Sequence, residues 1–184
     1  MDFIEKCRGY RSKKLEKIGT LLVKTGITAN HLTALSFLSG LLTIYFLFVE
    51  YYLFVLFALL HLLFDAFDGV LARLTKPTTA GKYVDLISDS LVTVLALVKV
   101  GWFLQEFYAY IAAGLFLGAL AVHLLSKLSA PIFFMRTATL LVLIIATNPA
   151  FPFTKILLTV GYLTAGGVSL FSLAKQLQWF TGKK

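Results

Sequence analysis

Three long segments of this chain contain no charged residue. They cover residues 32–49, 137–154 and 156–174, and each is 18 or 19 residues long. A helix needs about 20 predominantly apolar residues to cross the hydrocarbon core of a membrane. We therefore expect each segment to form a membrane-spanning helix, and a water-soluble globule is excluded.

Three further segments are equally apolar apart from four aspartates and two histidines. The whole chain of 184 residues is 59% hydrophobic and only 14% charged, whereas soluble domains are about 25% charged. The predicted fold class is an all-α integral membrane protein with six transmembrane helices. The three additional spans are expected at residues 51–72, 83–98 and 107–126.

The amino-terminal segment has a different pattern. Between residues 3 and 25, apolar positions such as Ile4, Leu15 and Ile18 recur at helical spacing, while most Lys and Arg lie elsewhere. This pattern predicts an amphipathic helix on the membrane surface. We therefore divide the chain into an amphipathic juxtamembrane segment, 1–30, and a six-helix transmembrane domain, 31–184, with Asn30 expected to cap the first span.

The positive charges predict the orientation. If the amino terminus is cytoplasmic, 15 of the 17 Lys and Arg residues fall on the inner side, and only Lys99 and Lys155 fall outside. Positive residues near span ends are retained in the cytoplasm, so both termini are expected there. The net charge of +8 then indicates attraction to a membrane surface, and we expect no nucleic-acid partner.

Four of the nine acidic residues lie inside or at the end of apolar spans: Asp65, Asp68, Asp85 and Asp89. Each costs roughly 2.5–3.5 kcal/mol at the centre of a membrane helix. Asp65 and Asp68 are three residues apart and Asp85 and Asp89 four, so each pair projects from one helical face. The short turn between the two helices brings these faces together, and four carboxylates are expected to converge.

Converging carboxylates require a counter-charge. A ligand set made only of hard oxygens favours Mg²⁺ or Mn²⁺ over zinc, and we expect two ions that hold a diphosphate. The small residues Gly69, Ala72 and Gly81 leave room for a ligand near the helix backbones. Arg73 follows Ala72 and offers a positive charge suited to phosphate.

The residues Asp65-Ala-Phe-Asp68-Gly69-Val-Leu-Ala72-Arg73, followed by Gly81-Lys-Tyr-Val-Asp85-Leu-Ile-Ser-Asp89, closely resemble the signature of the CDP-alcohol phosphotransferase family. All eight signature residues are present. The chain departs from the family pattern in two places: the loop before Gly81 is one residue shorter, and Ala29 replaces a common proline before Asn30.

The resemblance implies transfer of a phosphatidyl-type group, diacyl or archaetidyl, from a CDP-linked lipid to an alcohol, with release of CMP in phospholipid biosynthesis. It implies that Asp65, Asp68 and Asp85 bind the metals, and that Asp89 binds metal or acts as the general base. It also implies a homodimer with its active site facing the cytoplasm, and we expect a prokaryotic cell membrane. The CDP-binding residues implied are Asp68, Gly69, Ala72, Arg73 and Gly81.

The acceptor alcohol is less constrained. Lys127 and Arg136 flank the inner turn between the fourth and fifth spans and would suit a small polar alcohol that carries phosphate, such as glycerol phosphate or inositol phosphate. The orientation rule alone also accounts for cations there. Serine and a lipid alcohol therefore stay open as acceptors. His123, within the fourth span, is expected to be packed and hydrogen-bonded.

Two other classes of membrane protein use intramembrane aspartates. An intramembrane prenyltransferase needs two Asp-rich motifs on a larger bundle, and this chain is too short for that. A small transporter with an acidic cation site should carry polar groups across the full membrane depth. Here the aspartates lie at one end of two adjacent spans, which favours a site that opens to the membrane surface.

Overall fold

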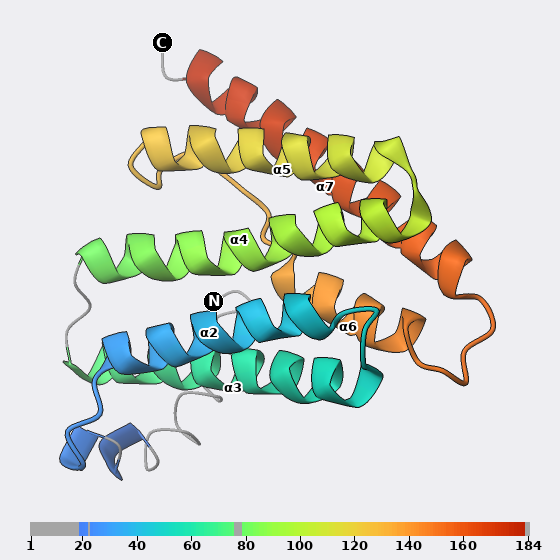
Figure 1. The fold of residues 1–184 in the computed structure, drawn as a ribbon. Helices are drawn as coiled ribbons and strands as arrows, with labels where there is room; N and C mark the ends of the chain where they lie inside the picture. Colours follow the sequence, from blue (N-terminus) through green and yellow to red (C-terminus); the bar gives the residue numbers. More distant parts are fainter. Residues whose placement is uncertain (1–18, 22, 76–78, 183–184) are drawn as a thin grey trace, which may run out of the picture.

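The computed structural model describes residues 19–21, 23–75 and 79–182, and all its regular structure in these ranges is helical (Figure 1). The amphipathic helix expected over residues 3–25 lies mostly outside the described residues and stays a prediction, as does the loop between α3 and α4. The helices are α2 (Ala29–Phe46), α3 (Tyr51–Thr75), α4 (Thr79–Leu104), α5 (Phe107–Leu125), α6 (Arg136–Ala146) and α7 (Thr154–Thr181).

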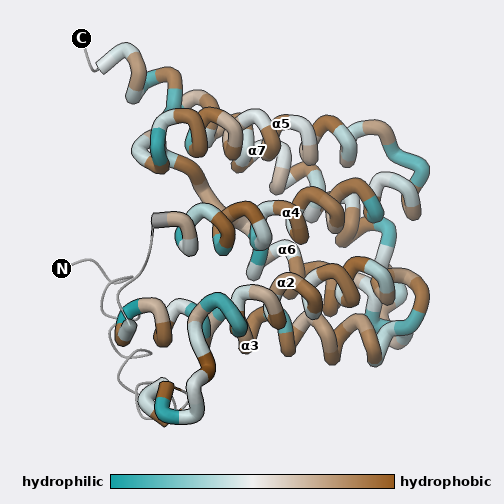
Figure 2. Tube along the Cα trace, turned by 60° about the vertical axis from the view of Figure 1, so that its left-hand side comes forward, coloured by the Kyte–Doolittle hydropathy of each residue, from teal (hydrophilic) through white to brown (hydrophobic). Residues whose placement is uncertain are grey.

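Four of these helices, α3, α4, α5 and α7, are long and apolar enough to cross a membrane. Their outer faces carry large exposed apolar side chains, such as Leu56, Leu59 and Leu63 of α3, and hydrophobic residues dominate the helices in Figure 2. Exposed apolar surface on this scale is typical of contact with lipid. The chain is therefore a multi-pass membrane protein, and the full count of six spans stays a prediction.

The helix observed at the fifth expected span is shorter than the uncharged segment 137–154. Helix α6 has only 11 residues, about 16 Å at 1.5 Å per residue. Before it, residues 129–135 have no helical structure. In Figure 1 this connection leaves the end of α5 and reaches α6 partway along the bundle. The expectation of an 18-residue helix is thus wrong, and Arg136 lies within the bundle rather than at its edge.

Helix α2 begins earlier than the expected Asn30 cap. Thr28 is the N-cap residue: its Oγ1 accepts a hydrogen bond from the backbone N–H of His31, and the backbone N–H of Thr28 donates to His31 Nδ1, both at 3.4 Å. This reciprocal arrangement satisfies two backbone donors at the helix end. Asn30 lies one residue inside the helix.

Helix α3 packs along α2, α5 packs along α7, and α4 contacts both pairs (Figure 1). Gly40 permits close contact among α2, α3 and α4, because a Cβ there would lie 2.6 Å from Val92 Cγ2 and 3.2 Å from His61 Nδ1. At the opposite end of α4 from the aspartates, Lys99 Nζ donates to the carbonyls of Ile44 and Tyr45, at 2.5 and 2.8 Å. These contacts fix α4 against the α2–α3 pair.

Candidate metal and nucleotide site

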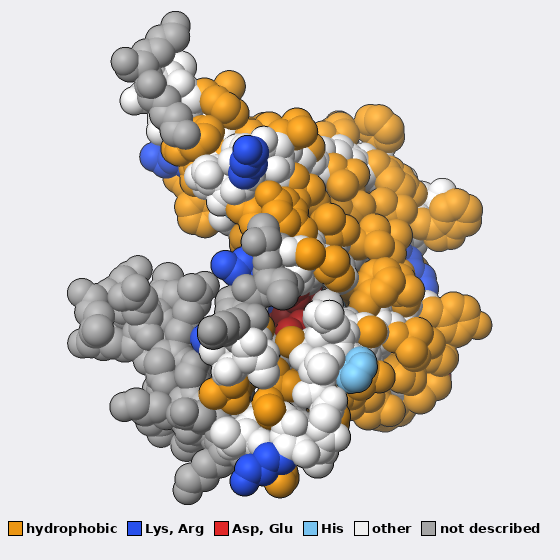
Figure 3. Space-filling view, turned by 90° about the vertical axis from the view of Figure 1, so that its left-hand side faces the viewer, with side chains coloured by type: hydrophobic (Ala, Val, Ile, Leu, Met, Phe, Trp, Pro, Cys, Tyr) orange, Lys and Arg blue, Asp and Glu red, His pale blue; other side chains and the backbone are white. Residues whose placement is uncertain are grey.

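Three aspartates meet between α3 and α4. Over their described residues these two helices do not pack directly against each other as the short turn predicted; each packs instead against α2 and α6. Asp65 of α3 and Asp85 and Asp89 of α4 each offer a carboxylate oxygen, and these oxygens lie within 4.8 Å of one another. All three side chains are partly buried. Figure 3 shows acidic surface at the bottom of a hollow in this end of the molecule, with Lys and Arg side chains near its rim.

Asp68 does not join this group of three. It is buried, and one of its carboxylate oxygens accepts a hydrogen bond from the Thr33 hydroxyl of α2. The structure thus brings three of the four expected carboxylates together and turns the fourth toward α2. Thr33 had no distinguishing signal in the sequence, because threonines are common in membrane helices.

Arg136 lies among the acids. Its Nη2 atom is 2.5 Å from Asp65 Oδ2, and its Nη1 atom forms an ion pair with Asp89. Only 12% of the Arg136 side chain is exposed. From the sequence, Arg136 was expected at the inner turn between the fourth and fifth spans, whereas the short α6 brings it into the acid group. Its guanidinium supplies positive charge that the carboxylates need in a buried setting.

One cavity lies beside Asp68, where α2 and α4 begin and α3 ends. It has a volume of about 260 Å³, and we call it the Gly69 cavity. Gly69 leaves open space, since a Cβ built on it has no neighbour within 4 Å. Its lining residues are Thr28, Ala29, Asn30, Thr33, Asp68, Gly69, Ala72, Thr75, Gly81, Lys82 and Asp85.

A second cavity of about 280 Å³ lies on the other side of Asp85, and we call it the Ser90 cavity. Asp85 lines both cavities, so the two spaces adjoin the same carboxylate. The lining of the Ser90 cavity consists of Asp65, Asp85, Leu86, Asp89, Ser90, Thr93, Phe116, Phe134, Met135, Arg136 and Thr137. The charged residues of this cavity were predicted from the sequence, whereas its hydroxyl residues, Ser90, Thr93 and Thr137, were not.

A model of the CDP-alcohol phosphatidyltransferase family matches residues 26–166 of this chain. The chain belongs to that family. No curated protein and no solved structure matches it. As a family member it is a transferase of phospholipid biosynthesis, which moves a phosphatidyl-type group from a CDP-alcohol donor to an alcohol acceptor in a membrane. The match includes α2 to α6 and every residue of both cavities.

The residues of this CDP-alcohol phosphatidyltransferase fit the divalent metal on which the family generally depends. The donors are carboxylate oxygens, which Mg²⁺ and Mn²⁺ prefer. Two oxygens bound to one magnesium ion are at most about 4.2 Å apart, so the oxygens of Asp65, Asp85 and Asp89 need to move little. A cation bound there competes with Arg136 for two of these carboxylates.

The remaining predicted residues lie in different places. Four of the five expected CDP-binding residues line the Gly69 cavity, whereas Arg73 is exposed at the end of α3 and is not among its lining residues. Lys127 is exposed and lines neither cavity. His123 is packed and hydrogen-bonded as expected, with its Nδ1 2.5 Å from the carbonyl oxygen of Ala130 and its ring against Phe134.

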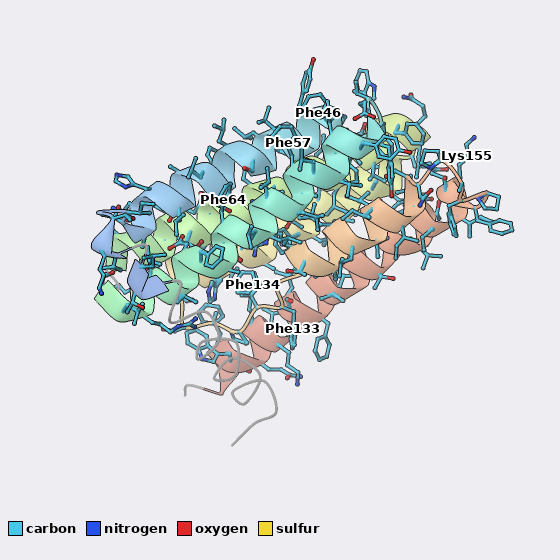
Figure 4. All side chains as sticks on the ribbon, turned by 90° about the horizontal axis from the view of Figure 1, so that it is seen from below. Phe46, Phe57, Phe64, Phe133, Phe134 and Lys155 are labelled. Carbon is cyan, nitrogen blue, oxygen red and sulfur yellow. The ribbon has the colours of Figure 1, made fainter. Side chains whose placement is uncertain are left out.

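Figure 4 shows where Phe134 and Lys155 lie along the length of the bundle. Phe134 lies on the connection that enters the bundle before α6, and Lys155 lies at one end of the bundle. Lys155 and the cavity-lining Phe134 are therefore well separated. This separation agrees with the expectation that Lys155 and the aspartates occupy different sides of the membrane, which stays a prediction.

We expect a large side chain at Gly69 to block the donor without harming the fold. In Gly69→Leu the added atoms enter open space, so CDP-lipid should bind at least tenfold more weakly while the thermal midpoint stays near the wild-type value. The KM for CDP-lipid and a melting curve measure the two effects. Gly40→Leu is the contrasting variant, because its Cβ meets Val92 at 2.6 Å and should destabilise the protein. An unchanged KM in Gly69→Leu would contradict the assignment of the cavity.

Proposed function

We propose that this protein transfers a phosphatidyl-type group, diacyl or archaetidyl, from a CDP-linked lipid to the hydroxyl of a small polar alcohol and releases CMP. One observation carries the proposal: two cavities adjoin Asp85, one lined by the signature glycines and the other by Asp89 and Arg136. Such an arrangement holds two substrates on either side of one acidic group, as a transfer between them requires.

The Gly69 cavity is the proposed binding site for the cytidine diphosphate group. Asp68, Gly69, Ala72 and Gly81 line it, and the open space at Gly69 lets a ligand approach the backbone of α3. Arg73 is one residue beyond Ala72, and its long side chain stays a proposed phosphate contact. Lys82 also lines this cavity and adds positive charge.

Asp65, Asp68, Asp85 and Asp89 are the proposed ligands of two Mg²⁺ or Mn²⁺ ions. When bound, divalent ions neutralise the diphosphate and the charge that develops on the departing CMP. Three of the four ligands already lie within 4.8 Å of one another. Asp68 would supply its carboxylate from the wall of the Gly69 cavity, which is the proposed site of the diphosphate.

Asp89 is the proposed general base. It lines the Ser90 cavity, where its carboxylate accepts the proton of the acceptor hydroxyl. The acceptor oxygen attacks the phosphorus that carries the lipid, a new P–O bond forms, and the bond to CMP breaks. Arg136 lines the same cavity, which supports its role toward an acceptor that carries phosphate, such as glycerol phosphate or inositol phosphate. Lys127 does not line this cavity, so it would contact the phosphate of the acceptor from outside.

A lipid alcohol is the second candidate acceptor. An apolar cavity of about 210 Å³ lies among α4, α6 and α7, and it shares Met135 with the Ser90 cavity. A hydrocarbon chain in this space would lead toward Asp89. Serine carries no such chain and would occupy the Ser90 cavity alone. A cation transporter gains no comparable support from these cavities.

The proposed membrane arrangement has six crossings, of which the fifth combines the non-helical residues 129–135 with the short α6. Both termini and the two cavities lie on the cytoplasmic side in this proposal. The homodimer stays part of this proposal. Gly114 and Gly118 of α5 support it, because a Cβ on either would meet nothing within 4 Å and small residues four apart favour close helix packing. Gly166 instead packs against Ala112 within the chain.

The decisive experiment supplies purified protein with CDP-lipid, magnesium and one acceptor at a time. The panel contains glycerol phosphate, inositol phosphate, serine and a lipid alcohol, and release of CMP is the readout. We expect CMP with one acceptor and only background hydrolysis with the others. Absence of CMP with every acceptor would contradict the proposed function, and preference for the lipid alcohol would favour the second candidate.

A further inference from the structure

Ser90 holds a buried hydroxyl that the described residues do not satisfy. The residue is 2% exposed, and among the described residues its Oγ has no hydrogen-bond partner. A buried hydroxyl left unpaired loses its bonds to water and gains none in return. Such a group in a native protein needs an explanation.

Other buried hydroxyls in this bundle bond to the carbonyl four residues earlier. Thr43 Oγ1 donates to Ser39 O at 2.8 Å, and Ser169 Oγ donates to Ala165 O, also at 2.8 Å. The same geometry is available to any serine inside a helix, yet Ser90 does not use it. Its hydroxyl is free to bond to a molecule in the space that it lines.

That space is the proposed acceptor cavity. Ser90 follows the proposed base Asp89 in the chain, and both line the cavity together with Arg136. The neighbouring hydroxyl of Thr93 already donates to the carbonyl of Asp89 at 3.2 Å. Ser90 therefore offers an uncommitted hydroxyl close to the group that would receive the acceptor's proton.

We propose that Ser90 is a specificity-determining residue that hydrogen-bonds the acceptor alcohol; this rests on the proposed function. A serine hydroxyl both donates and accepts, so it suits a second hydroxyl or an amino group on the acceptor, beside the hydroxyl that reacts. The acceptor class is thus an alcohol with at least one further polar group near its reacting oxygen. A simple monohydric alcohol leaves Ser90 unpaired and binds more weakly.

The test replaces Ser90 with Ala and follows the kinetics of each substrate separately. We expect the KM for the acceptor to rise about tenfold, as for a lost hydrogen bond, and the KM for CDP-lipid to stay unchanged. The preference for the polar acceptor over a monohydric alcohol should shrink by a similar factor. The thermal midpoint should not fall, because Ala removes an unsatisfied hydroxyl rather than a bond.

Ser169→Ala is the matched control. Ser169 is as deeply buried as Ser90, but it lines neither cavity beside the aspartates, so both KM values should match the wild type. An unchanged acceptor KM in Ser90→Ala, an equal rise in both KM values, or a lower thermal midpoint would each overturn the role of Ser90. An inactive wild-type protein would instead contradict the proposed function on which it rests.

Discussion

Replacing Asp89 with Asn should abolish CMP release and leave the fold intact. Asn matches the shape of Asp but cannot accept the proton of the acceptor hydroxyl, and general base catalysis contributes about 10²- to 10⁴-fold. The fold should persist because Arg136 keeps its pairing with Asp65 at 2.5 Å. The measurements are the rate of CMP release and the thermal midpoint of the purified variant.

Glu106→Gln is the control for this substitution. Glu106 precedes α5, and its side chain makes no capping hydrogen bond, so this variant should keep full turnover. Full turnover of Asp89→Asn would remove the base assignment. Because Asp89 is also a proposed metal ligand, Mn²⁺ binding of Asp89→Asn is measured as well: loss of turnover with retained Mn²⁺ binding would assign the effect to the base.

Removing divalent metal should stop the reaction completely. With the cation absent, Arg and Lys side chains such as Arg73, Lys82 and Arg136 do not suffice to offset the charge of the diphosphate and the leaving CMP. Excess EDTA should reduce CMP release to background, and added Mg²⁺ or Mn²⁺ should restore it. Metal-independent turnover would contradict the proposed two-ion site.

The metal can also be followed without turnover. Asp85 lies in the group of three carboxylates and lines both cavities, so Asp85→Asn should weaken Mn²⁺ binding on the order of 100-fold. Titration of the Mn²⁺ electron paramagnetic resonance signal measures this affinity, and Glu106→Gln should bind like the wild type. Equal affinities in the wild type and Asp85→Asn would place the ion elsewhere.

The aspartate spacing predicted four converging carboxylates, and three of them do converge. Residues four apart, such as Asp85 and Asp89, differ by about 40° around a helix, whereas residues three apart, such as Asp65 and Asp68, differ by about 60° in the other sense. The angle of about 60° between Asp65 and Asp68 points Asp68 away from the group of three carboxylates and toward Thr33. The hydrogen-bond partner of Asp68 depends on how α2 packs against α3. The aspartate motif carries no information about that packing.

The length and starting position of α6 were the main features that the hydropathy pattern did not predict. An uncharged run over 137–154 has the same composition whether it crosses the membrane completely or only in part. Asn148, Pro149 and Pro152 mark its end. Pro131 marks a break before it, but a break alone does not show that residues 129–135 enter the bundle. The ion pairs of Arg136 follow from that entry. The uncommitted hydroxyl of Ser90 was equally invisible, since it depends on the absence of a bond.

Arg136 is fixed to the polypeptide from the moment of its synthesis. Its pairing with Asp65 and Asp89 means that two of the partly buried acids have a neutralising partner within the chain itself while the helices enter and pack in the bilayer. Biogenesis of this protein therefore need not wait for ion supply. Scarcity of divalent metal ions would then limit lipid output without reducing the amount of correctly assembled protein.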